Sequence, residues 1–284
     1  MNFEIRPLSD GFGAEVIGLD LDQTLSDENF ETVRRAWFGA GVMVFRDQEL
    51  SPESQVAFSR RFGNPIIHVR KQFLLAGHPE ILMVSNKKHA DGTPHGFEDA
   101  GRYWHSDISY VEKPALGSML YAVELPPSGG DTLFADMGRA LETLPTETRQ
   151  RIDGRRALHS YTRNFEKSEA LNAGRPAMTS DQKSQVPNVT HPMVRTVEDT
   201  GRQTLFVNPG FTFGIKDMDE SESDPLLSEL FAHSTKPELI YAHQWKPRDL
   251  LCWDNRAVMH QATPFDPAYT RHMRRTTIEG GRPV

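Results

Sequence analysis

The feature that most constrains this chain is the wide separation of two segments that share one character. Residues 103–110 (YWHSDISY) and 253–260 (WDNRAVMH) both set a histidine and an aspartate among aromatic and apolar residues. More than half of the 284 residues lie between His105 and His260. A site that contains both histidines therefore requires a fold that brings strands distant in sequence side by side, as barrels and sandwiches do.

The composition agrees with such an architecture. The 21 glycines and 19 prolines favour short elements joined by many turns over a long-helix bundle, which predicts a mainly β fold. A chain of this length with 37% apolar residues can bury a substantial core, and we expect a single domain over residues 1–284. The net charge of −7 and the pI near 5.9 offer no basic surface for a nucleic acid, so we expect a small-molecule partner.

The one cysteine and the N-terminal segment bear on location. Cys252 lies in an apolar run, so no internal disulfide and no thiolate metal cluster can form. The start, MNFEIRPLSDGFGAEV, lacks the pattern of a signal or transit peptide, and no later stretch approaches the roughly 20 apolar residues of a membrane span. We therefore expect a cytoplasmic protein without a membrane partner.

Apolar periodicity and turn residues divide the chain into short elements. Strands are predicted at residues 3–8, 14–21, 41–45, 103–110, 117–124, 204–208, 238–245, 249–253 and 271–279. Helices are predicted after Ser26, from Ser51 to Gly63, and near residues 135–153 and 223–234, with the two serines as N-caps. Residues 87–102 and 163–190 are polar and aperiodic, which is typical of binding loops or lids.

The first candidate for chemistry is a metal site. In a strand, His105 and Asp107 would lie on one face with Cα atoms about 6.8 Å apart, close enough to share one ion. His260 would complete a set of two histidines and one carboxylate that leaves coordination positions open, as in non-haem Fe(II) oxygenases. Taken alone, the His-x-Asp tripeptide is a weak signal, because a hydrogen-bonded core histidine explains it more simply. The same set also suits zinc.

A strand of arginines follows closely after His260. Arg271, Met273 and Arg275 would share one face, and two guanidiniums buried without partners would be costly, so that face predicts bound anions. The alternative is an outward basic strand. His272 and Arg274 could then be the solvated positions. The alternation of side chains alone does not decide which face of the strand points inward.

Four segments together resemble the taurine dioxygenase and 2,4-D (phenoxyacetate) dioxygenase family of iron and 2-oxoglutarate enzymes. They are WHSD at 104–107, GGDT at 129–132, WDNRAVMH at 253–260 and RHMRR at 271–275, in the family's order and spacing. Each is weak by itself; GGDT, for example, is only a tight turn that enters a strand. The resemblance covers nearly the whole chain, and it implies a cupin-like jelly roll, or double-stranded β-helix, with flanking helices.

The resemblance also implies a cofactor and a cosubstrate site. His105, Asp107 and His260 match the ligands of the catalytic Fe(II). Thr132 and Arg271 match the clamp for the C5 carboxylate of 2-oxoglutarate.

On the substrate side, the resemblance places Arg275 and His68 at the anionic end of the primary substrate. Phe165 and Phe211 match aromatic residues of the substrate pocket in the taurine branch, to which residues 205–212 (LFVNPGFT) are most similar.

Two substrate positions depart from the taurine enzymes. Lys71 stands where they have a tyrosine and Gly101 near the place of an asparagine, two residues that recognise the substrate's amino group. A lysine would repel an ammonium and attract a second anionic or an uncharged polar group, so we expect a substrate other than taurine. The alternative for Lys71 is a solvent-facing side chain on a loop. Asp107 disfavours halogenation, because related halogenases have a small non-ligating residue there.

The resemblance thus implies a dioxygenase that consumes 2-oxoglutarate and O₂ and hydroxylates a small anion, namely a sulfonate, an alkyl sulfate, or a carboxylate such as a phenoxyalkanoate. Cleavage would follow if the hydroxylated carbon bears a heteroatom. Two alternatives stay open: a zinc-dependent hydrolase, which leaves Arg271 and Thr132 without a role, and a non-catalytic β-barrel that binds a small anion. Relatives commonly assemble as dimers or tetramers, and we expect a homo-oligomer.

Overall fold

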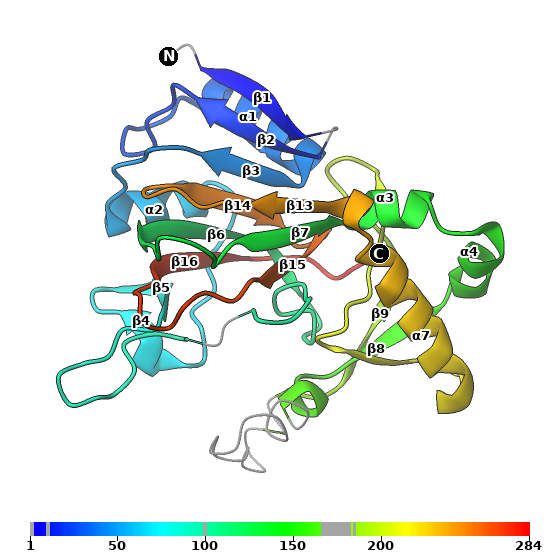
Figure 1. Cartoon of the computed structure of the whole chain (residues 1–284). Coiled ribbons are helices and arrows are strands. Elements are labelled where there is room, and N and C mark those ends of the chain that lie inside the picture. The colour runs from blue at the N-terminus through cyan, green and yellow to red at the C-terminus, as the bar shows by residue number, and fades with distance from the viewer. Residues whose placement is uncertain (1–2, 10–11, 99–100, 166–182, 184–185) are drawn as a thin grey trace.

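The main layer of the protein is an eight-stranded sheet. The computed structural model describes residues 3–9, 12–98, 101–165, 183 and 186–284 (Figure 1). In spatial order the strands are β1 (Glu4–Ser9), β2 (Phe12–Ile17), β3 (Val42–Phe45), β14 (Leu250–Asp254), β6 (Ala115–Glu124), β16 (His272–Glu279), β5 (His78–Ser85) and β4 (Leu74–Leu75). All neighbours are antiparallel except β2 and β3. The centre of the sheet therefore alternates strands from the middle and the end of the chain.

A second sheet of three strands faces the first across a core. It contains β13 (Ile240–His243), β7 (Thr132–Asp136) and β15 (Val258–Ala262), with β7 in the middle. One buried cluster joins both sheets, since Val84, Leu120 and Trp253 of the main sheet pack with Phe134 and Val258 of the second. Two facing antiparallel sheets make the predicted jelly roll (Figure 1).

Two helices cover the outer face of the main sheet. α1 (Asp27–Ala40) and α2 (Pro52–Arg60) begin at Ser26 and Ser51, whose side chains accept hydrogen bonds from backbone N–H groups in the first turn. Trp37 of α1 is 1% exposed and packs into a cluster that spans both helices and the β2, β3, β6 and β14 strands.

The remaining elements form a second lobe beside the three-stranded sheet. They are α3 (Met137–Glu142), α4 (Thr146–Ile152), β8 (Arg156–His159), β9 (Val189–Pro192), β10 (Val194–Thr196), β11 (Gln203–Leu205), β12 (Thr212–Ile215) and α7 (Glu220–Ser234), with short 3₁₀ turns η1 (Lys71–Phe73) and η2 (Pro237–Leu239) elsewhere. A separate apolar cluster holds the lobe together. Among the described residues, no helix is both long and apolar enough to cross a membrane.

The predicted mainly β fold with flanking helices is confirmed, and most predicted elements are present within a few residues. The strand expected at 14–21 ends at Ile17, because Gly18 takes a positive φ of 84° that breaks the extended chain. Most of the predicted loop at 163–190 lies outside the described residues.

The strand predicted at 103–110 is wrong. His105 forms only an isolated β-bridge with His260, and the chain then turns through Asp107, with Ile108 at a positive φ of 57°. Serine side chains explain the difference, since the Ser106 hydroxyl bonds to the Val258 carbonyl and competes with a regular ladder. The two ligands of this segment are therefore brought together by a turn and not by strand alternation.

Gly117 of β6 lies directly against the Trp37 ring of α1. A Cβ at Gly117 would lie 2.7 Å from the Trp37 ring and 2.8 Å from the Trp253 carbonyl oxygen. We predict that Gly117→Ala lowers the free energy of unfolding by about 2 kcal/mol through overpacking, measured by urea denaturation. The matched control is Gly39→Ala in α1, where nothing lies within 4 Å of the new Cβ, and a small gain in stability is expected. Equal effects of the two substitutions would contradict this account of the packing.

Candidate active site

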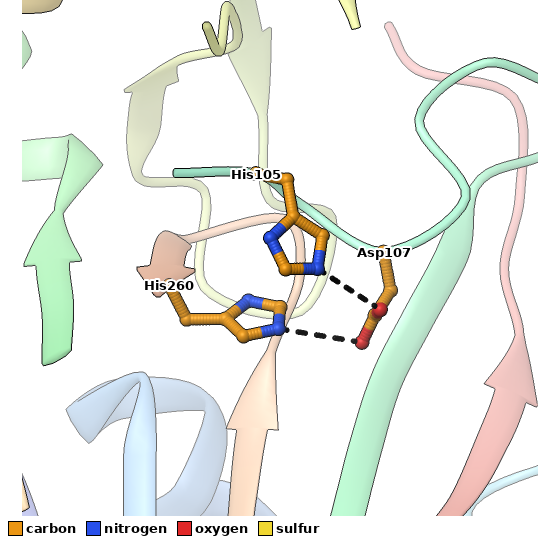
Figure 2. A group of neighbouring side chains, drawn as sticks. All are labelled: His105, Asp107 and His260. Carbon is orange, nitrogen blue, oxygen red and sulfur yellow. Dashed lines mark ion pairs between the residues drawn. The ribbon is translucent and has the colours of Figure 1, made fainter. Parts of the chain in front are cut away.

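Three buried side chains converge between the two sheets. Ligand atoms of His105, Asp107 and His260 all lie within 4.8 Å of one another, the one such group found among the described residues (Figure 2). The His105 Nε2 atom is 3.6 Å from Asp107 Oδ1, and the His260 Nε2 atom is 3.8 Å from Asp107 Oδ2. The backbones of the two histidines exchange N–H···O bonds of 3.0 and 2.8 Å. A β-bridge therefore places the two imidazoles on the same side of the chain.

The His105 imidazole presents a lone pair to the centre of this group. The Nδ1 atom of His105 lies 2.8 Å from the Tyr103 carbonyl oxygen and donates its proton to it. The lone pair of Nε2 is therefore available to bind a metal. Burial, with the neighbouring His105, holds the pKa of His260 well below the usual value of 6.5. His260 is therefore neutral at physiological pH, which metal binding requires.

The carboxylate of Asp107 is held ionised and oriented. Burial alone would raise its pKa, but the Arg275 guanidinium at 3.1 Å and the two histidines outweigh burial and hold the pKa well below 3.8. The Ser118 hydroxyl donates to Oδ2 at 2.7 Å, and the Asn255 side chain accepts from the Asp107 backbone N–H at 3.1 Å. Two imidazole nitrogens and one carboxylate are the donor set of a divalent transition metal with open positions.

Arg271 and Thr132 line one narrow cavity together with His105, His260 and Arg275. Among the described residues, the Arg271 guanidinium contacts only the Gly130 carbonyl, through Nε at 3.3 Å, and forms no ion pair. Burial lowers the pKa of Arg271 to about 10, although Asp131 nearby raises it. A buried guanidinium without a carboxylate partner requires an anionic ligand.

The family comparison adds to this geometry. The sequence profile described as taurine catabolism dioxygenase TauD, TfdA family matches residues 4–277. The chain belongs to this family.

Similar TauD/TfdA proteins include the alpha-ketoglutarate-dependent 2,4-dichlorophenoxyacetate dioxygenase of Cupriavidus pinatubonensis, 34% identical with 98% of each chain covered. Pentalenolactone F synthase of Streptomyces avermitilis is 35% identical, with 93% of this chain and 89% of the relative covered. Among solved structures, AAD-2 in complex with Mn(II) and N-oxalylglycine matches with a TM-score of 0.83 and 32% identity over 100% of this chain and 99% of that one. A taurine dioxygenase from Burkholderia xenovorans matches with a TM-score of 0.82 and 32% sequence identity, over 99% of this chain and 91% of that one.

The protein is thus an Fe(II)- and 2-oxoglutarate-dependent dioxygenase, and its residues fit both groups. The three converging side chains would hold the iron, and the unpaired Arg271 would hold a carboxylate of 2-oxoglutarate. The zinc-hydrolase and non-catalytic alternatives are set aside, since the family and the relatives named for 2,4-dichlorophenoxyacetate and (S)-phenoxypropionate are dioxygenases.

The alternation of the arginine strand is settled by the fold. Arg271, just before β16, and Arg275 of β16 line the cavity, as the inward interpretation predicted. Arg274 on the opposite face is only 8% exposed: its guanidinium lies over the Tyr121 ring and donates to the Leu50 carbonyl. The idea that Arg274 is solvated is therefore wrong, because α1, α2 and their connection cover that face of the sheet.

His68 lies close enough to Arg275 for the two to interact, but it carries no positive charge. Burial, then the charges of Arg275 and Arg70, lowers the pKa of His68 to about 4. Its Nδ1 atom accepts the Arg70 backbone N–H at 3.1 Å, so the ring proton resides on Nε2. The predicted anion-binding histidine can act as a neutral donor. Lys71 is exposed at the start of η1 and does not line the cavity, so its predicted contact with substrate stays a prediction.

Aromatic rings surround the outer side of His105. Phe211 lies 6.1 Å from the His105 ring and 4.7 Å from the Tyr110 ring. Tyr103 packs on both His105 and Phe211. The ring centroid of Tyr161 lies 4.7 Å from that of Tyr110 and 6.4 Å from that of Phe165. We call this set, Tyr103, Tyr110, Tyr161, Phe165 and Phe211, the aromatic wall. The three tyrosines of the aromatic wall were not predicted from the sequence, although two of them, Tyr103 and Tyr110, flank the His105 segment.

Gly101 leaves space directly beside a metal ligand. A Cβ at this position would lie 3.2 Å from His105 Cε1 and 3.9 Å from His105 Nε2. The residue takes a positive φ of 77°, which glycine adopts freely. A glycine at position 101, near the place of an asparagine in the taurine enzymes, therefore leaves the cavity wider next to the iron site.

We predict that Arg271→Met separates function from stability. Loss of the guanidinium should weaken 2-oxoglutarate binding by about 100-fold or more, whereas the free energy of unfolding should stay the same or rise, because a buried unpaired cation is removed. Calorimetric titration and urea denaturation measure the two effects.

The matched control is Arg256→Met. Arg256 is also buried, but it pairs with Asp254 at 2.8 Å and Asp199 at 2.6 Å. Its loss should destabilise the fold by about 3 kcal/mol. A comparable loss of stability in Arg271→Met would show that Arg271 is paired within the protein.

Proposed function

We propose that the primary substrate is a small carboxylate or sulfonate that carries an aromatic or other bulky apolar group, a phenoxyalkanoate being the type case. The observation that carries this proposal is the aromatic wall packed on His105, together with the Arg275 guanidinium that binds the neighbouring metal ligand Asp107. A ligand that spans both would need an anionic end and an apolar body.

Arg275 supports the anionic end. It follows Arg271 by four residues, about 13.6 Å along an extended chain, and both line the cavity, so the two guanidiniums suit two different anions on either side of one metal. Arg275 is 12% exposed in its side chain, and its Nε atom has no partner among the described residues. The neutral His68 adds a hydrogen-bond donor near the same place.

The described residues that line the cavity do not favour a substrate with a cationic end. None of the described residues that line it is an aspartate or glutamate, and Asp107 beside it is already bound to Arg275 and Ser118. A substrate ammonium such as that of taurine would face two guanidiniums without a counter-charge. Relatives named for 2,4-dichlorophenoxyacetate and (S)-phenoxypropionate are consistent with an aryl carboxylate here.

The division of labour follows from these contacts. Bound iron with O₂ and 2-oxoglutarate supplies the oxidising power to hydroxylate a C–H bond. Arg275 and His68 orient the anionic end, and the aromatic wall packs the apolar body against the metal side of the cavity and excludes water. If the hydroxylated carbon also bears an ether oxygen, the resulting hemiacetal breaks to a carbonyl compound and a phenol.

Three further expectations stay as proposals. A single domain over residues 1–284 is supported by the family match over 4–277. A cytoplasmic location and assembly as a dimer or tetramer rest on the sequence reading alone, and light scattering of the purified protein tests the assembly.

The substrate proposal predicts a preference that a panel can measure. Succinate formation that depends on O₂ and 2-oxoglutarate should be faster with phenoxyacetate and 2-phenoxypropionate than with taurine. Phe211→Ala should raise the KM for the aryl substrates about tenfold, since a buried aromatic contact is lost, and change the KM for a short alkyl sulfonate little. Turnover of taurine above that of every aryl acid would refute the proposal.

The state of His68 predicts the pH dependence of substrate binding. A group with a pKa of about 4 is neutral above that pH, so the substrate KM should be flat from about pH 6 to 8 as far as His68 is concerned. His68→Gln, which keeps a donor near Nε2, should bind substrate better than His68→Ala. A KM that rises through about pH 6.5 in the wild type and is flat in His68→Gln would mean that His68 binds as a cation.

A further inference from the structure

The Thr132 hydroxyl is held by an indole that the reaction does not otherwise use. The Nε1 atom of Trp245 lies 3.1 Å from the Thr132 Oγ1 atom. Thr132 begins β7, is 3% exposed, and lies opposite His243 of β13 in the register of the second sheet. Trp245 follows His243 by two residues, so the end of β13 delivers the indole to the threonine.

The chemistry of the two groups fixes the direction of this hydrogen bond. An indole N–H can only donate, so the Thr132 oxygen must accept. The hydroxyl proton of Thr132 is then left to serve another acceptor, and none is found among the described residues. Thr132 shares the cavity with Arg271, whose guanidinium also donates and also lacks an anionic partner. The two free donors therefore converge on one acceptor-only group, which is a carboxylate.

The indole itself is fixed by a buried cluster. The His243 ring meets it edge-on, with centroids 4.7 Å apart and planes at 88°. His243 is fully buried, lies 3.3 Å from Asp249 and bonds to the Tyr241 hydroxyl at 3.1 Å, and Asp249 is ion-paired with Arg46. Trp245 thus has little freedom to turn its N–H away from Thr132.

We propose that Trp245 is a positioning residue for the cosubstrate. By occupying a lone pair of Thr132, it directs the threonine proton toward the C5 carboxylate of 2-oxoglutarate on Arg271. The inference rests on the assignment of Thr132 and Arg271 as the 2-oxoglutarate clamp. It also predicts discrimination, because a terminal amide, as in 2-oxoglutaramate, would bring its own donors against two donors.

The test is a double-mutant cycle on binding and kinetics. The Mn(II)-loaded protein is titrated calorimetrically with N-oxalylglycine, a 2-oxoglutarate analogue, in the wild type, Trp245→Phe, Thr132→Val and the double variant. Trp245→Phe keeps a ring beside His243 and removes only the donor. We expect its Kd to rise on the order of fivefold, and we expect no further rise when it is added to Thr132→Val. In turnover, the KM for 2-oxoglutarate should rise, with kcat at saturating 2-oxoglutarate unchanged.

The control is Trp37→Phe. Trp37 also has a buried indole N–H, but it has no hydrogen-bond partner among the described residues and lies in the core under α1, so the substitution should alter stability without altering the Kd. If Trp245→Phe does not fold, Trp245→His, which keeps a ring N–H, is compared with Trp245→Leu in the same titration, and only the leucine variant should bind weakly.

The outcomes are separable. No binding of N-oxalylglycine by the wild type would defeat the clamp assignment itself. Tight binding by both the wild type and Trp245→Phe would overturn the role of Trp245 alone. An equal loss on adding Trp245→Phe to Thr132→Val would overturn it as well, because the indole would then act by shape and not through the hydroxyl.

Discussion

The paired backbone hydrogen bonds between His105 and His260 are the contact on which the rest of the site depends. They join a loop from the first half of the chain to β15 near its end, and they bring the two imidazoles to a centroid separation of 4.1 Å. The jelly roll makes this contact possible because β7 and β15 lie side by side across the core from β6 and β14. Without the bridge, Asp107 would have no partner ligands.

The charged side chains give different parts of the cavity opposite charges. Asp107 supplies its negative charge to the metal side, while Arg271 and Arg275 leave two positive ends. Such a site is costly to fold and is stabilised by its ligands, since the buried Arg271 guanidinium has no ion-pair partner among the described residues. The rings of Tyr103 and Phe211 in the aromatic wall pack on His105, which places apolar surface next to the metal ligands.

Sequence patterns predicted the parts of this protein that depend on local chemistry. Serine caps and glycine and proline turns follow from the local sequence, and the structure agrees. Spacing also placed Arg271 and Arg275 on one face, but only the fold shows that this face points to the cavity. The segment at 103–110 could not be read in this way, because its apolar alternation imitates a strand while the Ser106 hydroxyl and the Ile108 conformation form a turn. Partners far apart in sequence, such as Trp245 with Thr132, leave no local signal at all.

The most direct test of the account is the visible spectrum of the anaerobic protein loaded with Fe(II). A bidentate 2-oxoglutarate on an iron held by His105, Asp107 and His260 should give a weak metal-to-ligand charge-transfer band when 2-oxoglutarate is added. The band should need far more 2-oxoglutarate in Arg271→Met. Iron bound in the wild type without this band, at any concentration of 2-oxoglutarate, would contradict the assignment of the site.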